Sequence, residues 1–228
     1  MCPHRCSDGG KVSVKRVHSV IDLSTIDYPG HLAAVIFFSG CPWRCQMCYN
    51  ARVVIDPPNL TINEALGFVK EQLPLIDACV LLGGEPLLHP LRVVEEVCRK
   101  LKEYGLSVKL DTNGNYPRKL RHLLQRRLVD FVAMDIKHVP KLEKLKRVDP
   151  TFTEDRLRRT MTSVQLLKSC NIPYELRTVV VDPLHTIEDV AELRRLFPEI
   201  KIHKYSPEGE QLFRKKPLRP LDGVDYDD

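Results

Sequence analysis

The chain has 228 residues, of which 43% are hydrophobic and 29% charged, and its formal net charge is +5. These values are typical of a globular domain, and no apolar run is long enough for a membrane span or a signal peptide. We therefore expect a cytoplasmic protein with no membrane partner. The positive charge is modest and dispersed, without interleaved aromatic residues, so we expect no nucleic-acid surface.

Eight cysteines is a high number for a chain with no sign of secretion. In a reducing compartment they are not expected to form a disulfide framework. Three of them lie in or beside apolar stretches, and we expect them to be buried as small hydrophobic side chains: Cys79, Cys98 and Cys170. Cys2 and Cys6 lie in residues 1–12, which we expect to form a flexible tail. The alternative for that pair is a second metal site that also includes His4.

In chain order, residues 13–210 are predicted to form one core in which strands alternate with helices. A short strand over 12–21 comes first, and the continuous apolar run 32–39 is typical of a buried strand. A helix over 61–72 follows, because Thr61 and Glu64 have the spacing of a capping box. The alternation continues with strands at 79–82, 106–110, 129–136, 174–181 and 200–205 and helices at 91–104, 117–126, 155–169 and 187–197.

Six strands separated by five helices predict an α/β fold with a parallel sheet and right-handed crossovers. In a chain of this length the pattern favours a partial (β/α)6 barrel, and the alternative is a doubly wound open sheet. Residues 211–228 are expected to form a C-terminal tail. In both folds the catalytic and ligand-binding residues lie at the carboxyl ends of the strands.

Polar motifs follow the ends of these strands, as that rule requires. Each motif alone could be an ordinary loop, but their coincidence at one edge of the sheet indicates a single site. In chain order they are Cys41-x3-Cys45-x2-Cys48, Gly83-Gly84-Glu85-Pro86, Asp111-Thr112-Asn113-Gly114, Asp135-Ile136-Lys137, and the pair Glu175 and Arg177 within the fifth strand.

The three clustered cysteines predict a metal centre, because thiolates are soft ligands that select zinc, copper(I) or iron–sulfur clusters. A structural zinc site needs four closed ligands, and no fourth Cys or His follows at zinc-finger spacing. A [4Fe–4S] cluster also usually has four cysteine ligands, so three would leave one iron open. An open coordination position is typical of a catalytic centre.

The cysteine motif, with aromatic Tyr49 after its last cysteine, resembles that of the radical S-adenosylmethionine (radical SAM) superfamily. The resemblance implies that Cys41, Cys45 and Cys48 bind a [4Fe–4S] cluster and that S-adenosylmethionine occupies the open iron. It further implies a set of residues around the bound S-adenosylmethionine: Tyr49, Gly83, Gly84, Glu85, Pro86, Asp111, Asn113, Asp135, Lys137 and Arg177.

Specific roles follow from the same resemblance. The Gly83–Pro86 segment would receive the methionyl amine, and Lys137 would neutralise the methionyl carboxylate. Asp111 and Asn113 would lie beside the ribose, and Asp111 would also line a monovalent cation site. No side chain is required as an acid or base, because the cofactors carry the chemistry.

Each of these motifs also has an ordinary structural interpretation. The two glycine-containing segments could be simple turns, and Asp135 with Lys137 could be a salt pair at a strand end. Arg177 suits contacts to a carboxylate or a ribose, but it could instead form an ion pair with Glu175. The basic residues between 141 and 147 are interpreted as a solvated face, with a docking site for an acidic partner as the alternative.

The whole motif set, from Val14 to Tyr205, most resembles the activating proteins of anaerobic ribonucleotide reductase. The resemblance implies that flavodoxin or ferredoxin reduces the cluster, and that a 5′-deoxyadenosyl radical then takes a hydrogen atom from a glycine of the partner enzyme. One alternative is a radical SAM enzyme that acts on a small molecule, such as a deazaguanine synthase. A second is a zinc-binding interaction module without enzymatic activity.

Overall fold

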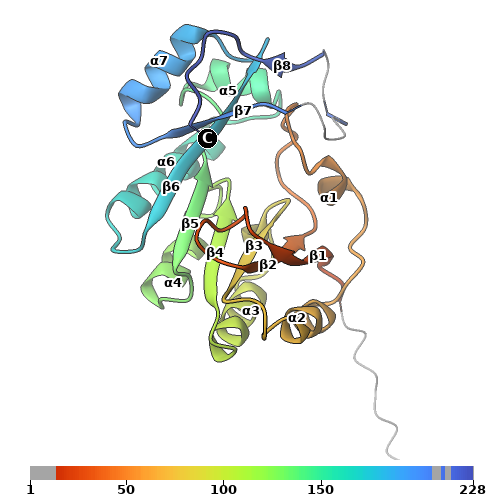
Figure 1. Cartoon of the computed structure of the whole chain (residues 1–228). Coiled ribbons are helices and arrows are strands. Elements are labelled where there is room, and N and C mark those ends of the chain that lie inside the picture. Colours follow the sequence, from red (N-terminus) through yellow and green to blue (C-terminus); the bar gives the residue numbers. More distant parts are fainter. Residues whose placement is uncertain (1–13, 207–211, 214–216, 228) are drawn as a thin grey trace, which may run out of the picture.

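A computed structural model of the chain describes residues 14–206, 212–213 and 217–227 (Figure 1). Cys2, His4 and Cys6 therefore lie outside the described residues. Within them, no helix is long and apolar enough to cross a membrane. The strands are β1 (Val17–Ser24), β2 (Ala33–Phe38), β3 (Ala78–Gly83), β4 (Ser107–Thr112), β5 (Phe131–Asp135), β6 (Tyr174–Asp182), β7 (Lys201–Lys204) and β8 (Arg219–Pro220).

The helices lie between these strands in the predicted alternation. They are α1 (Ala51–Ile55), α2 (Ile62–Glu71), the 3-10 turn η1 (Pro86–Leu88), α3 (Leu91–Glu103), α4 (Pro117–Gln125), α5 (Leu142–Val148), α6 (Glu154–Lys168) and α7 (Ile187–Leu196). The capping box at the start of α2 is confirmed, since Thr61 and Glu64 exchange hydrogen bonds of 2.8 and 3.2 Å. The short helices α1 and α5 were not predicted, because each is too brief to show a helical period.

The sheet order is β1-β2-β3-β4-β5-β6-β7, with β2 to β7 parallel and β1 antiparallel to β2. Strand order thus follows chain order without reversing, so the α/β partial barrel is confirmed and the doubly wound alternative is wrong. Strand β1 begins at Val17, and the described residues 14–16 before it are not part of a strand. The sheet is open and does not form a closed barrel, because β1 and β7 are not paired with each other in the described part of the chain.

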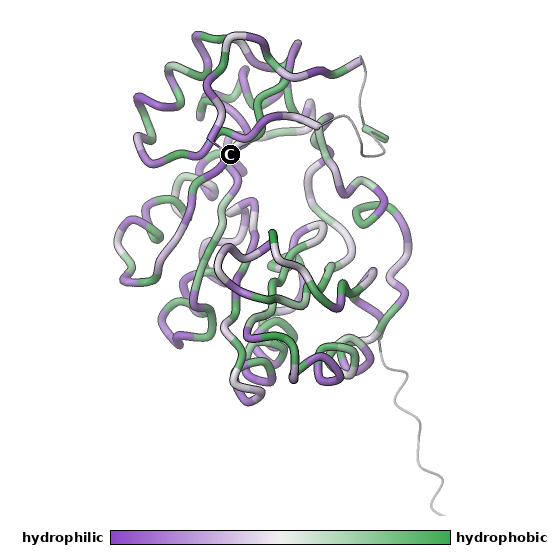
Figure 2. Tube along the Cα trace, in the orientation of Figure 1, coloured by the Kyte–Doolittle hydropathy of each residue, from purple (hydrophilic) through white to green (hydrophobic). Residues whose placement is uncertain are grey.

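The buried hydrophobic residues of the described chain form three clusters, one of which packs around the cysteine loop and includes Trp43, Met47 and Phe152. The largest lies between the sheet and its helices and includes Phe38, Leu81, Leu101 and Leu123. Hydrophobic and hydrophilic residues alternate along the helices in Figure 2, as expected for helices with one buried face. The third lies inside the curved sheet and includes Val35, Val80 and Tyr28. Cys79 and Cys98 are fully buried as predicted, whereas Cys170 is only partly buried.

The predicted C-terminal tail packs on the barrel where the structure describes it. Strand β8 pairs antiparallel with the end of β6, and the Leu218 side chain is 7% exposed. Asp227 exchanges two hydrogen bonds with Ile202 of β7, at 2.8 and 2.9 Å. Residues 217–227 therefore cover the β6 and β7 edge of the sheet.

Candidate active site

A cavity of about 580 Å³ opens at the carboxyl ends of the parallel strands. It brings together eleven of the thirteen residues predicted for the site: Cys41, Cys45, Cys48, Tyr49, Gly83, Gly84, Asp111, Asn113, Asp135, Lys137 and Arg177. The other two, Glu85 and Pro86, lie outside its lining. Sequence analysis gave no role to a further set of lining residues: Ile26, Asp27, Trp43, Met47, Asn50, Val54, Leu82, Thr112, Val179 and His203.

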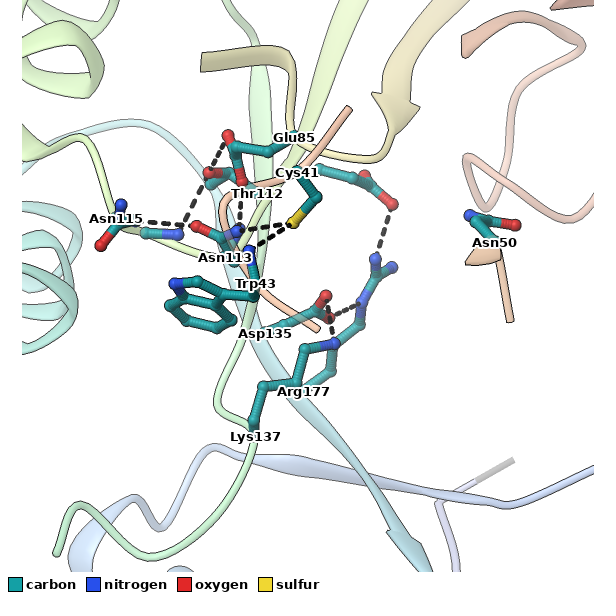
Figure 3. A network of polar contacts seen from close by, with 12 residues as sticks. Cys41, Trp43, Asn50, Glu85, Thr112, Asn113, Asn115, Asp135, Lys137 and Arg177 are labelled. Atoms are coloured by element: carbon teal, nitrogen blue, oxygen red, sulfur yellow. Dashed lines mark hydrogen bonds and ion pairs between the residues drawn. The ribbon is translucent and has the colours of Figure 1, made fainter. Parts of the chain in front are cut away.

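The three cysteines follow β2 directly and form one wall of the cavity. The Cys41 sulfur accepts hydrogen bonds from the Trp43 backbone N–H at 3.4 Å and the Asn113 Nδ2 at 3.6 Å (Figure 3). Burial raises the pKa of the Cys41 thiol to about 12 and also raises the pKa of Cys45 and Cys48. Only a positively charged centre would hold all three as thiolates here, which fits an iron–sulfur cluster.

A single metal ion fits this wall less well. Among the described residues, no group of three or more Cys, His, Asp or Glu side chains lies close enough to hold one ion. The zinc-binding module predicted as an alternative therefore finds no site in the described part of the chain. Three thiols around one cavity instead suit a centre with several metal atoms, with a separate iron for each sulfur.

The cysteine loop is held from outside by residues far away in the sequence. The Asp149 carboxylate, which is fully buried, accepts a hydrogen bond of 2.9 Å from the Arg44 backbone N–H. Arg156 of α6 donates to the Pro42 carbonyl at 2.9 Å, and Gln46 donates to the Arg147 carbonyl at 2.7 Å. These contacts fix the loop backbone, and no sequence motif had indicated them.

The two adjacent glycines are required by backbone packing. A Cβ atom on Gly83, whose φ is +124°, would lie 2.5 Å from the Phe38 backbone. A Cβ atom on Gly84 would lie 2.0 Å from the Gly40 carbonyl oxygen. Only glycine permits this approach, so the β3 loop packs directly against the start of the cysteine loop.

Glu85 joins two loops beneath the cavity. It is fully buried and accepts hydrogen bonds from the Thr112 hydroxyl at 2.9 Å, the Asn113 N–H at 2.8 Å and the Leu87 N–H at 3.0 Å. Burial raises its pKa to about 7. Pro86 begins η1 behind it. Both residues support the loop that carries Gly83 and Gly84, and their contact with S-adenosylmethionine stays a prediction.

Charged side chains from β4, β5 and β6 form the opposite wall. Arg177 bridges two carboxylates, with 2.6 Å to Asp111 and 2.9 Å to Asp135, and Lys137 lies 2.9 Å from Asp135 (Figure 3). Burial alone would raise the pKa of Asp135, but Lys137 and Arg177 hold it well below its usual range. Lys109 contacts the other Asp111 oxygen at 2.8 Å. Each of these two carboxylates is thus paired with two cations, Asp111 with Arg177 and Lys109, and Asp135 with Arg177 and Lys137.

The ion pairs of Asp135 and Glu175 bear on two of the ordinary structural interpretations. The salt pair between Asp135 and Lys137 exists, but it is part of the cavity wall. The predicted alternative of an ion pair between Arg177 and Glu175 is wrong, since Glu175 pairs with Lys201 at 2.8 Å. Arg177 turns instead toward the carboxylates of the neighbouring strands, because parallel pairing sets Arg177 beside Asp135.

At the rim of the cavity, Tyr49 stacks on Tyr205 with 5.8 Å between ring centroids, and its hydroxyl accepts a hydrogen bond from the Ser206 N–H. Ile26, in the loop after β1, is 83% exposed at the same opening. Asp27 and His203 had been given no role at the site. They reach the site only because β1 and β7 are the two edges of the curved sheet.

The basic residues between 141 and 147 form ion pairs with α7. Lys144 lies 2.7 Å from Asp189, and Lys141 lies 2.9 Å from Glu192. Arg147 donates to the Pro183 carbonyl at 2.9 Å. The cluster is therefore engaged within the fold and carries less free charge than its sequence indicates.

Comparison with known proteins bears on the same residues. A family model described as the radical SAM superfamily matches residues 35–197, which span the cysteine loop and every strand of the charged wall. The chain belongs to the radical SAM superfamily. This radical SAM protein is accordingly an oxidoreductase whose cofactors are a [4Fe–4S] cluster and S-adenosylmethionine.

Its relatives include activating enzymes. A Methanocaldococcus jannaschii protein with the provisional name glycyl-radical enzyme activating enzyme is 31% identical over 210 residues, covering 89% of this chain and 85% of its own. The pyruvate formate-lyase-activating enzyme of Listeria monocytogenes is 24% identical over 237 residues, covering 92% and 90%. These similarities support an activase-like function for the radical SAM protein.

Other matches are shorter or more distant. The 7-carboxy-7-deazaguanine synthase of Methanopyrus kandleri is 29% identical over 139 residues, covering 51% of this chain and 54% of its own. A radical SAM methyltransferase structure from Sphaerobacter thermophilus superposes with a TM-score of 0.65 at 16% identity, covering 86% of this chain and 61% of the longer protein. That likeness supports the fold alone.

Proposed function

We propose that the protein activates a glycyl-radical enzyme, and that its partner is an anaerobic ribonucleotide reductase. The observation that carries the proposal is the open edge of the barrel beside the cavity. Strands β1 and β7 leave the sheet unclosed, and the apolar Ile26 side chain stands 83% exposed at the rim. A glycine-bearing loop of another protein could reach the cavity through this opening.

We assign the cluster to the cysteine loop and the methionyl group to the opposite side of the cavity. Cys41, Cys45 and Cys48 would hold the cluster, which when bound supplies the electron that cleaves S-adenosylmethionine to a 5′-deoxyadenosyl radical and methionine. Lys137 would neutralise the methionyl carboxylate, because it lines the cavity and, among the described residues, its one ion pair is with Asp135. The Gly83 and Gly84 carbonyls would accept from the methionyl amine.

The remaining residues would contact the adenosine part. Asp111 would accept a hydrogen bond from the ribose, and Arg177 would hold Asp111 and Asp135 in place for that contact. The Asn113 amide is directed to the Cys41 sulfur, so we assign it to the cluster side. Both Asp111 oxygens already contact cations, Lys109 and Arg177. We therefore do not propose the monovalent cation site that the resemblance implies at Asp111.

Electron paramagnetic resonance tests the proposal directly. Cluster-loaded protein, dithionite and S-adenosylmethionine would be mixed anaerobically with one candidate glycyl-radical enzyme at a time. We expect a glycyl signal with an anaerobic ribonucleotide reductase and none when the Cys45→Ala variant replaces the activase. A signal only with a pyruvate formate-lyase would reassign the partner.

The same assay also separates the small-molecule alternative, which the deazaguanine synthase match favours. If S-adenosylmethionine is cleaved to 5′-deoxyadenosine but every glycyl-radical enzyme stays silent, the activase proposal is overturned. A search for 7-carboxy-7-deazaguanine among the products would then test deazaguanine synthase chemistry.

A further inference from the structure

A second cavity, of about 530 Å³, lies between α4 and α6 on the outer side of the barrel. Five cationic side chains line it, and no carboxylate does among the described residues: Arg118, Lys119, Arg121, Arg158 and Arg159. The remaining lining comes from Asn115, Tyr116, Pro117 and Thr162. We call this feature the basic cavity.

Little of this positive charge is neutralised locally. Arg158 and Arg159 share one carboxylate, that of Asp155. In the described part of the chain, the hydrogen bonds that Lys119 donates all go to backbone carbonyls, at Leu87, Leu88 and His89. Arg118 and Arg121 are exposed, and within the described residues neither has a carboxylate at ion-pair distance. Five cations against one carboxylate create a strong positive potential in a concave surface, which attracts an acidic partner.

Hydrogen bonds connect the walls of the basic cavity to the cysteine loop. Asn115, which is 4% exposed and has an unpartnered Oδ1, forms its inner wall. The Asn115 N–H donates to Asn113 Oδ1 at 2.9 Å, and Asn113 Nδ2 donates to the Cys41 sulfur at 3.6 Å (Figure 3). On the other wall, α6 reaches the same loop through Arg156 and the Pro42 carbonyl. Two hydrogen bonds thus connect the basic cavity to a cluster cysteine.

We propose that the basic cavity is the docking site of the electron donor, a small acidic protein that carries one electron. The inference rests on the proposed function, which needs an external reductant. In the transfer the donor is oxidised by one electron and the cluster is reduced by one, while no bond or proton moves. Docking here brings the donor close to Cys41.

The position of the basic cavity also keeps the two partners apart. Helices α4 and α6 flank β5, away from the edge strands β1 and β7 (Figure 1). The rim of the main cavity includes Ile26 after β1 and His203 of β7. A donor bound at α4 and α6 leaves that rim free. The radical acceptor can therefore remain in place while the cluster is reduced.

Charge reversal tests the proposal. The variant Arg118→Glu/Arg121→Glu alters two exposed cations on α4, and the matched control Lys70→Glu/Arg92→Glu makes the same change in net charge on α2 and α3. Purified flavodoxin and ferredoxin are the probes. Their binding to cluster-loaded protein is measured by fluorescence titration at low and at high salt, and S-adenosylmethionine cleavage is measured with each donor and with dithionite.

We expect the α4 variant to bind at least one donor about tenfold or more weakly at low salt, with a reduced salt dependence, while the control binds like wild type. Donor-driven cleavage should fall in parallel, and dithionite-driven cleavage should be unchanged. Equal losses in variant and control, unchanged affinity, or no binding of either donor to wild type would overturn the proposal. Failure of the proposed function is a separate outcome: donor-driven cleavage responds to charge reversal, yet no glycyl radical forms.

Discussion

The cysteine loop and the charged strand wall face each other across one cavity, but they are held in place in different ways. Arg177, Asp111 and Asp135 lie on or beside paired strands and satisfy one another's charges directly. The cysteine loop has hydrogen bonds of its own, such as that from Arg44 to the Cys41 carbonyl, but no ion pair between its own side chains among the described residues. It depends on Asp149 and Arg156, more than a hundred residues away. One wall is thus organised by the sheet itself, and the other needs both distant supports and a metal centre.

The largest expected effect is on the loop wall. Replacing Cys45 with Ala removes one of three thiolates, so we expect iron content to fall from about four per chain to near zero. Cleavage of S-adenosylmethionine should disappear with it. The control is Cys170→Ala, which changes a partly buried cysteine away from the cavity and should retain the cluster. Full iron loading of the Cys45 variant would remove this loop as the cluster site.

Removing Arg177 tests the strand wall. Arg177→Met leaves Asp111 and Asp135 without their shared cation, so the free energy of unfolding should fall by about 3–5 kcal/mol. Urea denaturation of the cluster-free protein measures this. Arg177→Lys, which keeps the charge but cannot bridge both carboxylates as a planar fork does, should lose less. A Met variant as stable as wild type would mean that the two carboxylates do not depend on Arg177.

Asp149→Asn tests the distant support of the loop. It weakens contacts to the Arg44 backbone and Arg156, and we expect a loss of about 2 kcal/mol in unfolding free energy. Iron release to a chelator should become faster, while the KM for S-adenosylmethionine should change little, because Asp149 is not in the cavity lining. The control is Asp155→Asn, which changes a half-exposed carboxylate at the start of α6. Unaltered iron release would show that the loop holds its shape alone.

The smallest effect concerns pH. Glu85 has a pKa of about 7 in the folded protein, raised by burial from about 4.5 in the unfolded chain. The folded state therefore binds the proton more tightly, and unfolding free energy should fall by about 1 kcal/mol per pH unit between pH 5 and 6.5. Glu85→Gln should remove this slope from the cluster-free protein, whereas Glu103→Gln should keep it. If the free energy of unfolding depended on pH equally in both variants, a group other than Glu85 would be responsible for the slope.

Much of this architecture could be predicted from local patterns. Alternating apolar runs and helical periods located all six parallel strands and the five helices between them. The rule that chemistry gathers at strand ends placed Cys41, Asp111 and Lys137 at one site. The short helix α5 was not predicted, because a helix of one or two turns shows no hydrophobic period. The antiparallel pairing of β1 with β2 was not predicted either, because it depends on contacts between the two strands that neither strand's own sequence specifies.

The fold class and a metal centre held by thiolates could be predicted from the chain alone, because strand periodicity and thiol spacing are local properties. The choice of a [4Fe–4S] cluster with S-adenosylmethionine came from the family resemblance of the motifs. The pairing of charges depends on the fold, since Arg177 could reach Glu175 by sequence spacing but contacts Asp111 and Asp135 on neighbouring strands. The position of Glu85 also depends on the fold, because its carboxylate accepts hydrogen bonds from Thr112 and Asn113 and is absent from the cavity lining. The same is true of the basic cavity, because α4 and α6 acquire a common surface only when the intervening strand brings them together.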